Sequence, residues 1–321
     1  MNEGSKRVRA LGAFSGGLDG MLAARVLMDQ NIHVEAVTFD SPFFDVDAGR
    51  RAAKELGIPW RGVDITGDIL ALLESPPSGF GKNMNPCIDC HAIMFRRLAE
   101  LAWAEGFDFI FSGEVVGQRP MSQNRGSLNR VRNLSGTAGV LLRPLSARIL
   151  DPTPMEEQGL VDRDGLLGLN GRGRTAQLEL AERYGFKLIP APAGGCLLTD
   201  PGYSKRLRVL KEHGLLSAGN ARMIRLGRMF ILKKAIGIAG RSEAENRDIG
   251  REAFGCLIDL ADVPSPLGTI LGEATEENIR TLAAIMAHTP GAAAPSPRLP
   301  PGAVRTGKMD PATREGYTVI L

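Results

Sequence analysis

The stretch VRALGAFSGGLDG, residues 8–20, decides the expected fold of this 321-residue chain. Residues 8–14 are mostly apolar and predict a buried β-strand, and residues 21–28 have the spacing of an amphipathic helix. The glycines between them let successive backbone N–H groups and the helix N-terminus converge on an anion. The stretch therefore predicts a phosphate-binding turn between a strand and a helix.

Strand and helix signals alternate over residues 1–200. Such alternation predicts parallel strands joined by crossover helices, with ligands bound at the carboxyl ends of the strands. The expected fold is therefore α/β, with a Rossmann-like parallel sheet in this first domain. Further strands are expected at 34–39, 60–65, 107–112 and 141–144, and helices at 47–56, 87–105 and 175–184.

Length and composition indicate a protein of more than one domain. The chain of 321 residues exceeds the usual size of a single core, and 43% of its residues are hydrophobic. The N-terminus leads directly into the first strand, and no apolar run is long enough to cross a bilayer. We therefore expect neither a secretory signal nor a membrane span, and predict a cytoplasmic protein.

The glycine-rich loop is not a Walker loop, because no Gly-Lys-Ser or Gly-Lys-Thr closes it. It resembles the Ser-Gly-Gly-x-Asp-Ser loop of the PP-loop ATP pyrophosphatases, which grip the pyrophosphate of ATP and activate a substrate by adenylation. The final Ser of that pattern is Gly20 here, so one hydroxyl is absent while the backbone donors remain. The resemblance implies an adenine nucleotide α-hydrolase-like fold that binds ATP and Mg²⁺ through Ser15, Gly16, Gly17, Leu18, Asp19 and Gly20. Asp19 acts there through the metal, by fixing the loop, or as an N-terminal helix cap.

Residues that follow other strands are expected at the same edge of the sheet. In the family, backbone after the second strand holds adenine, which implies that role for Thr38 and Phe39. Gly113 and Gln118 follow a further strand and are expected to line the nucleotide. Arg143, near another strand end, is a candidate contact for substrate phosphate.

The chain has four cysteines, and three of them lie in motifs that suggest chemistry. Cys87 and Cys90 form a Cys-x-x-Cys pair at a helix start, where the helix N-terminus lowers the pKa of a thiol. Together with Cys196 they could hold a [4Fe–4S] cluster, or Cys196 could carry a persulfide that one of the pair resolves. A zinc site and haem attachment are further alternatives. Cys256, among apolar residues, is expected to be a core thiol.

The segment NPCIDC, residues 85–90, resembles the Asn-Pro-Cys-x-x-Cys region of the tRNA 2-thiouridylase family. Gly195-Cys196-Leu197 resembles that family's second catalytic-cysteine segment, and the whole combination also resembles the iron–sulfur tRNA thiolases. The resemblance implies an ATP-dependent tRNA sulfurtransferase. Its implied catalytic residues are Asp19, Cys87, Cys90 and Cys196, and the three cysteines are the implied ligands of a [4Fe–4S] cluster.

Such an enzyme adenylates a base carbonyl, releases pyrophosphate and replaces the oxygen by sulfur. The sulfur comes from a cysteine desulfurase or from free sulfide, and assembly into a homodimer is compatible with the sequence. Two other hypotheses remain open. One is a superfamily enzyme that thiolates a small molecule or a carrier protein, and the other is an RNA-associated nucleotide-binding factor in which Gly20 marks the loss of ATP cleavage.

Beyond residue 200 the chain becomes basic. Residues 203–241 carry ten Lys or Arg and a single acid, Glu212, although the net charge of the whole chain is only +3. Residues 221–230 are expected to form a helix with one cationic stripe suited to a phosphate backbone. The candidate tRNA-binding residues are Arg206, Arg222, Arg225, Arg228, Lys233 and Lys234.

The predicted organisation after the first domain has two parts. A basic connecting segment covers 201–240, and a small basic α+β domain covers 241–321. Within the latter, 278–287 predicts a helix, 289–302 a Pro/Ala-rich linker and 317–321 a closing strand.

Overall fold

The computed structural model describes residues 7–119, 121–191, 195–253, 255–260, 265–288, 303–305 and 318–320. The chain forms two compact units, residues 1–196 and residues 197–321. The first unit contains the glycine-rich loop and the three candidate cysteines.

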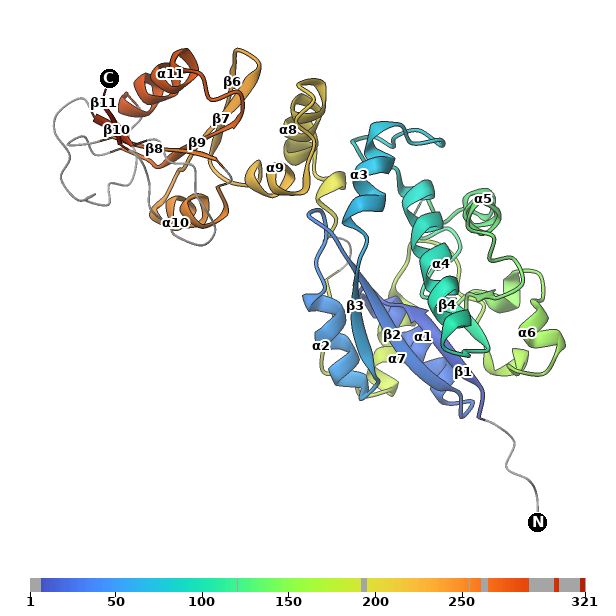
Figure 1. Cartoon of the computed structure of the whole chain (residues 1–321). Helices are drawn as coiled ribbons and strands as arrows, with labels where there is room; N and C mark the ends of the chain where they lie inside the picture. Colours follow the sequence, from blue (N-terminus) through green and yellow to red (C-terminus); the bar gives the residue numbers. More distant parts are fainter. Residues whose placement is uncertain are drawn as a thin grey trace. The chain divides into compact units, whose positions relative to one another are not determined.

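A five-stranded parallel sheet forms the centre of the first unit (Figure 1). Its strand order is β3-β2-β1-β4-β5, and all neighbouring strands run parallel. The order places β1 between β2 and β4, so the loops that follow these three strands share one edge of the sheet. The predicted α/β fold is confirmed. The strands are β1 Arg9–Ala13, β2 His33–Asp40, β3 Trp60–Asp64, β4 Phe109–Ser112 and β5 Leu141–Leu142.

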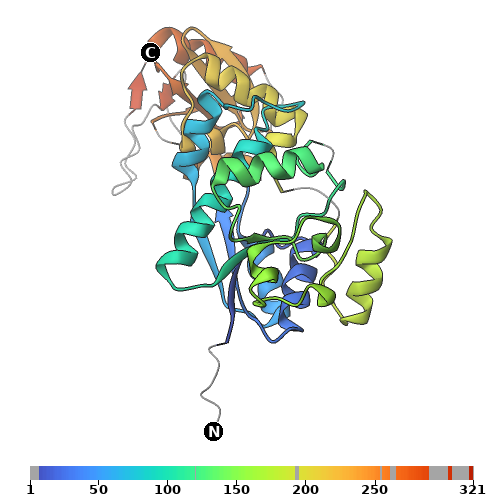
Figure 2. The same ribbon diagram turned by 90° about the vertical axis from the view of Figure 1, so that its right-hand side faces the viewer.

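Helices cover both faces of this sheet. α1, α2 and α7 pack together on one face, and α3, α4 and α5 pack together on the other (Figures 1 and 2). The predictions at 47–56, 87–105 and 175–184 correspond to α2, α4 and α7, whereas α3 and α5 were not predicted. The helices are α1 Leu18–Met28, α2 Asp47–Leu56, α3 Thr66–Glu74, α4 Cys87–Ala104, α5 Arg125–Ser135, α6 Pro154–Glu157 and α7 Thr175–Arg183.

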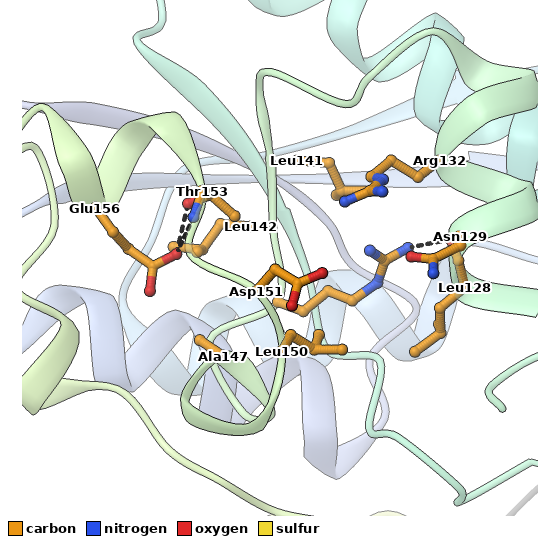
Figure 3. Close-up of a pocket in the computed structure, with 11 residues that line it drawn as sticks. Leu128, Asn129, Arg132, Leu141, Leu142, Ala147, Leu150, Asp151, Thr153 and Glu156 are labelled. Atoms are coloured by element: carbon orange, nitrogen blue, oxygen red, sulfur yellow. Dashed lines mark hydrogen bonds between the residues drawn. The ribbon is translucent and has the colours of Figure 1, made fainter. Parts of the chain in front are cut away.

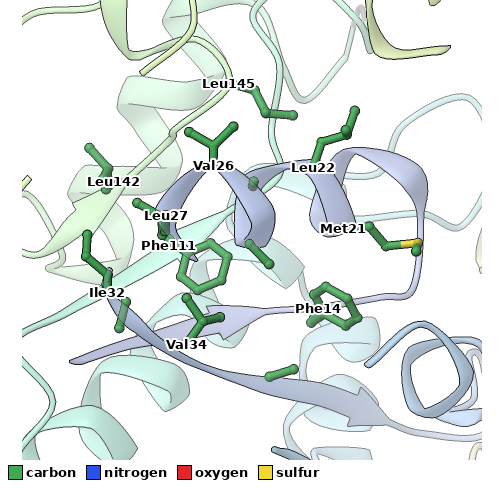
Figure 4. Close-up of a cluster of buried hydrophobic side chains, with 14 of the residues drawn as sticks. Phe14, Met21, Leu22, Val26, Leu27, Ile32, Val34, Phe111, Leu142 and Leu145 are labelled. Carbon is green, nitrogen blue, oxygen red and sulfur yellow. The ribbon is translucent and has the colours of Figure 1, made fainter. Parts of the chain in front are cut away.

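Apolar side chains of α1 pack onto the sheet and form much of the core (Figure 4). Met21, Leu22 and Leu27 are fully buried and lie with Phe14 and Phe111 in one apolar cluster. Burial of each such side chain stabilises the fold by roughly 1.5–3 kcal/mol. The glycine-rich loop is therefore anchored at both ends, by β1 before it and by the buried face of α1 after it.

The second unit is built on an antiparallel sheet with strand order β11-β10-β8-β9-β7-β6. Leu232, Ile258 and Ile270 of the sheet pack against Leu282 and Met286 of α11 in its core. The strands are β6 Arg228–Leu232, β7 Ala235–Ala239, β8 Cys256–Leu260, β9 Gly268–Gly272, β10 Ala303–Arg305 and β11 Thr318–Ile320. The helices are α8 Pro201–Glu212, α9 Ala218–Met223, α10 Glu243–Glu252 and α11 Glu276–Ala287.

The helix predicted at 221–230 is wrong in its second half. α9 ends at Met223, and β6 begins at Arg228. Gly227 between them has a φ of +55°, and a Cβ there would lie 2.3 Å from the carbonyl oxygen of Ala239, so the chain turns tightly into the sheet. The apolar residues that follow pair with β7 instead of continuing a helix. Residues 228–239 are therefore part of the second sheet and not of a connecting segment.

Two remaining predictions concern the chain termini and membranes. The linker predicted at 289–302 lies outside the described residues, while β11 lies within the strand predicted at 317–321. Across the described ranges, no helix has both the length and the apolar character needed to cross a membrane.

Candidate functional site

The glycine-rich loop turns the chain from β1 into α1. Gly16 has a φ of +79°, a left-handed conformation that glycine adopts without strain. A Cβ at Gly16 would lie 2.3 Å from the carbonyl carbon and oxygen of Ala48, because the loop passes directly over the first turn of α2. The loop thus needs glycine here both for its backbone conformation and for the close approach.

The N-terminus of α1 has no side-chain cap. Gly17 is the N-cap residue, with extended backbone at φ −75° and ψ 158°. The first N–H groups of a helix point out of its end and can donate to an anion. Because Gly17 occupies the cap, Asp19 does not serve as the cap that one interpretation of the sequence assigned to it.

The loop after β4 presses against the first turn of α1. A Cβ at Gly113 would lie 2.5 Å from the amide nitrogen of Gly20 and 2.6 Å from the carbonyl carbon of Asp19. Gly20 itself leaves room for a side chain, since a Cβ there would meet only ring carbons of Phe14 at 3.5 and 3.7 Å. The serine of the family pattern would fit at position 20.

Asp19 lies beside the loop with one carboxylate oxygen bonded. Gln118 Nε2 donates to Asp19 Oδ2 at 2.8 Å, whereas Asp19 Oδ1 and Gln118 Oε1 are buried without a hydrogen-bond partner among the described residues. Burial raises the pKa of the Asp19 carboxyl, and Gln118 and Arg174 oppose that rise. Buried oxygens that lack donors fit a hard cation such as Mg²⁺.

The predicted adenine contacts, Thr38 and Phe39, lie buried at the end of β2. Thr38 Oγ1 donates to the carbonyl oxygen of Phe14 at 2.6 Å and accepts from Trp60 Nε1 at 2.8 Å, so its side chain serves the fold. The register of β2 with β1 ends at Val37, while that with β3 continues to Asp40. Any nucleotide contact from Thr38 or Phe39 therefore comes from the backbone on the β1 side.

Glu114, directly after β4, is the centre of a buried ion-pair cluster. Its Oε2 accepts from Arg143 Nε at 2.7 Å, and its Oε1 lies 3.1 Å from His91 Nδ1. Burial alone would raise the pKa of Glu114, but the charge of Arg143 and the contact with His91 lower it to about 2. Arg143, a predicted phosphate contact, is engaged in this pair instead. No local pattern in the sequence indicates this cluster, because its three members lie far apart in the chain.

A small cavity lies beside Arg143, between α5, β5 and α6 (Figure 3). Its volume is about 30 Å³, enough for about two water molecules. Glu156 on its wall already accepts hydrogen bonds from the backbone N–H and the hydroxyl of Thr153, both at 2.7 Å. The cavity is too small for a nucleotide, so the candidate site remains the loop edge.

The cysteine pair begins α4. Cys87 is the first residue of the helix, and Asn85 Nδ2 donates to its Sγ at 3.2 Å. Cys90 is buried one turn later. The pKa of the Cys90 thiol is raised well above its usual value, first by burial and then by its neighbours Cys196, Cys87 and Asp89. Cys196 thus lies near enough to Cys90 to affect the pKa of its thiol.

The metal-site prediction does not gain support from this arrangement. Within the described ranges, no three side chains of His, Cys, Asp or Glu lie together in a way that would hold a metal ion. The assignment of Cys87, Cys90 and Cys196 as ligands of a [4Fe–4S] cluster therefore stays a prediction. Cys256 lies in β8 of the other unit, where burial raises the pKa of its thiol to about 11.

The predicted tRNA contacts divide into two groups. Arg206 donates through Nη2 to the carbonyl oxygens of Leu226 and Gly227 at 2.8 and 3.1 Å, and Lys233 pairs with Glu277 at 3.3 Å. Arg206 is thus bonded to backbone of the second unit, and Lys233 forms an exposed ion pair. Arg222, Arg225, Arg228 and Lys234 are exposed.

The chain is similar to curated 2-thiouridylases over part of its length. It is 32% identical to the tRNA-specific 2-thiouridylase MnmA of Syntrophotalea carbinolica over 130 residues, 36% of this chain and 36% of the relative. It is 24% identical to the tRNA-specific 2-thiouridylase MnmA 1 of Syntrophus aciditrophicus over 232 residues, 64% of this chain and 61% of the relative. The chain thus spans less than two thirds of either relative. No protein-family model matches it.

Two solved structures show weaker similarity. A predicted subunit of tRNA methyltransferase from Methanocaldococcus jannaschii is 15% identical, with a TM-score of 0.39 over 64% of this chain and 88% of that one. A 4-thiouridine synthetase in complex with RNA and ATP is 19% identical, with a TM-score of 0.36 over 67% and 53%. Because these identities and TM-scores are low, the fold is assigned from the strand order and helix placement described above.

The strand order and the glycine-rich loop after β1 agree with the PP-loop pattern that the sequence resembles. The chain is distantly similar to the tRNA-specific 2-thiouridylases over part of its length.

The Glu114–Arg143 pair predicts a loss of stability in acid. The pKa of Glu114 falls from an ordinary value of 4.5 to about 2 on folding, so its contribution is complete above pH 4.5 and disappears as the pH falls towards 2. Glu114→Gln leaves Arg143 buried without its counter-ion, which costs about 3–5 kcal/mol at neutral pH. Urea unfolding at a series of pH values should show that the free energies of unfolding of Glu114→Gln and the wild type approach each other as the pH falls from 4.5 towards 2.

The matched control for that experiment is Glu105→Gln. Glu105 pairs with Arg61 at 2.6 Å, but the two side chains are 37% and 35% exposed. Loss of an exposed pair costs about 1 kcal/mol or less. Equal losses in the free energy of unfolding of the two variants would show that the buried ion pair contributes no more to stability than the exposed one.

The close approach of Gly113 to α1 predicts that a single methyl group disrupts the loop. Gly113→Ala should weaken ATP binding at least tenfold, because its Cβ collides with backbone of the first turn of α1. Gly67→Ala in α3 is the control, since a Cβ there has no atom within 4 Å. Isothermal titration with ATP measures both, and unchanged affinity in Gly113→Ala would refute the proposed role of this edge.

Proposed function

We propose that the protein is an ATP-dependent tRNA sulfurtransferase. One observation carries the proposal: a single compact unit holds both the phosphate loop and three cysteines, two of them electrostatically coupled to the third. The loop would bind ATP, and the cysteines would handle sulfur. The partial similarity to 2-thiouridylases supports tRNA as the substrate.

The first step activates the base. A carbonyl oxygen of the base attacks the α-phosphorus of ATP, the bond to the β-phosphate oxygen breaks, and pyrophosphate leaves. Ser15, Gly16, Gly17 and the N-terminus of α1 stabilise the negative charge on the departing phosphates. When bound, Mg²⁺ neutralises the polyphosphate. Asp19 would hold it through Oδ1, with Gln118 fixing the orientation of the carboxylate.

The second step delivers sulfur from a persulfide on Cys196, loaded by a cysteine desulfurase. The Cys87 thiolate attacks Sγ of Cys196, the persulfide bond breaks, and hydrosulfide leaves with its electron pair as a Cys87–Cys196 disulfide forms. Hydrosulfide then attacks the adenylated carbon and displaces AMP, leaving C=S. Two electrons and two protons from an external thiol reductant restore the two cysteines.

Exposure selects Cys87 over Cys90 as the attacking thiol. Cys87 is half-buried, and the Asn85 amide donates to its sulfur at 3.2 Å, which holds the side chain in place. Cys90 is only 8% exposed, and burial holds its thiol protonated. A buried, protonated thiol is a poor nucleophile, so Cys90 contributes packing.

The proposed activity predicts pyrophosphate release that depends on tRNA. The protein should release pyrophosphate from ATP with tRNA lacking the thio modification, because only an acceptor oxygen starts the reaction, and should form an equal amount of AMP when a sulfur donor is supplied. Release without tRNA but with a small acceptor that carries a carbonyl or carboxylate oxygen would favour the small-molecule alternative. Absence of release under any condition would favour the nucleotide-binding factor.

The persulfide route predicts different outcomes for the three cysteines. Cys87→Ala and Cys196→Ala should abolish thiolation and keep tRNA-dependent pyrophosphate release, whereas Cys90→Ala should keep both. Iron and acid-labile sulfide, measured after anaerobic purification, should be absent in all forms. About four irons per chain, lost in each of the three variants together with thiolation, would instead establish the cluster and overturn the persulfide route.

A further inference from the structure

The second unit has a strong separation of charge along its sequence. Residues 203–241 carry ten Lys or Arg and one acid, whereas residues 242–288 carry three Arg and nine acids. Side-chain pairing follows the same division. Cations in the second part have carboxylate partners nearby, and most exposed cations in the first part do not.

The arginines of α10 and α11 are neutralised within their own helices. Arg247 pairs with Glu243 at 2.6 Å, Arg251 with Asp248 at 2.6 Å and Arg280 with Glu276 at 2.7 Å. These exposed pairs at i,i+3 and i,i+4 spacing are the usual way in which a solvated helix balances its charge. They leave little net positive potential on these helices.

The exposed cations of α8, α9 and β6 are different. Among the described residues none of the following six forms an ion pair. We name them the unpaired basic set: Lys205, Arg208, Arg222, Arg225, Arg228 and Lys234. Lys233, at the tip of the β6–β7 hairpin, is not a member because Glu277 neutralises it.

Hydrogen bonds fix the segments that carry this set. Tyr203 of α8 donates through its hydroxyl to the carbonyl oxygen of Ala221 in α9 at 2.8 Å. Arg206 of α8 donates to the carbonyl oxygens of Leu226 and Gly227, which lie between Arg225 and Arg228. α8, α9 and the start of β6 are therefore joined directly, and they follow one another in Figure 1. The cations are held on an ordered frame and not on free chain.

We infer that the unpaired basic set binds the phosphate backbone of tRNA. Four of its six members are arginines, whose planar guanidinium groups match phosphate oxygens in a bidentate manner. Binding of such cations to a polyanion releases the condensed counter-ions of that polyanion, which favours association. The inference rests on the proposed function for the identity of the RNA, and it assigns the RNA contact to the second unit.

The test compares two triple variants of the full chain with equal change in charge. Arg222→Gln/Arg225→Gln/Arg228→Gln removes three members of the unpaired set, and Arg247→Gln/Arg251→Gln/Arg280→Gln removes three paired arginines from the same unit. The first should weaken binding of tRNA at least tenfold at 100 mM salt, and the slope of log affinity against log salt should fall by about 2–3. The control should stay within about twofold of the wild type. Circular dichroism and thermal unfolding check that both variants fold.

Four outcomes would count against the inference. Equal weakening in the two variants would show that only net charge matters, and unchanged binding in both would place the RNA contact elsewhere; either result leaves the proposed function intact. Tight binding of vesicles with anionic lipid, in preference to tRNA and lost in the first variant, would assign the set to membranes. No binding of tRNA by the wild type would overturn both the inference and the proposed function.

Discussion

The contact on which the candidate site depends is the buried bond between Glu114 and Arg143. It joins the chain after β4 to the chain after β5, and through His91 it also reaches α4, the helix that begins with Cys87. Two neighbouring residues after β4 make different contacts. Gly113 lies against the first turn of α1, and Glu114 forms the ion pair with Arg143. The glycine-rich loop and helix α4 are thus both in contact with one short stretch of backbone, Gly113 and Glu114.

An ion pair with 6% exposure is costly to bury, and its Coulomb attraction alone does not guarantee a gain in stability. The arrangement instead fixes the positions of the Glu114 and Arg143 side chains. Arg143 also donates to the carbonyl oxygen of Leu128 at 3.3 Å, and Ser112 donates to Glu114 at 3.3 Å, so the charges have several fixed neighbours. In the proposed reaction, small displacements of the helix that carries Cys87 would lower the rate strongly. The cluster ties the start of that helix to the loop edge beside α1.

The parallel sheet and the phosphate turn could be predicted because they depend on local pattern. The apolar run at 8–14, the glycines after it and the helical spacing at 21–28 specify their structure within about twenty residues. The ion-pair cluster of Glu114 forms only when the fold brings His91 and Arg143 next to it, and no local sequence pattern predicts those contacts. The predicted arginine stripe at 221–230 failed for a related reason. Spacing of three fits a helix, but the tight turn at Gly227 and pairing of β6 with β7 override it.

Under the proposed function, the second unit would supply contacts to the RNA backbone and the first unit would select the base. Phosphate contacts from an unpaired basic set provide affinity for any RNA of suitable shape and carry little information about the base. Under this proposal, selection of one base is left to the first unit, where buried oxygens of Asp19 and Gln118 lie beside the phosphate loop. A chain with a net charge of only +3 can thus bind a polyanion, because the charge that matters is the local charge left unpaired.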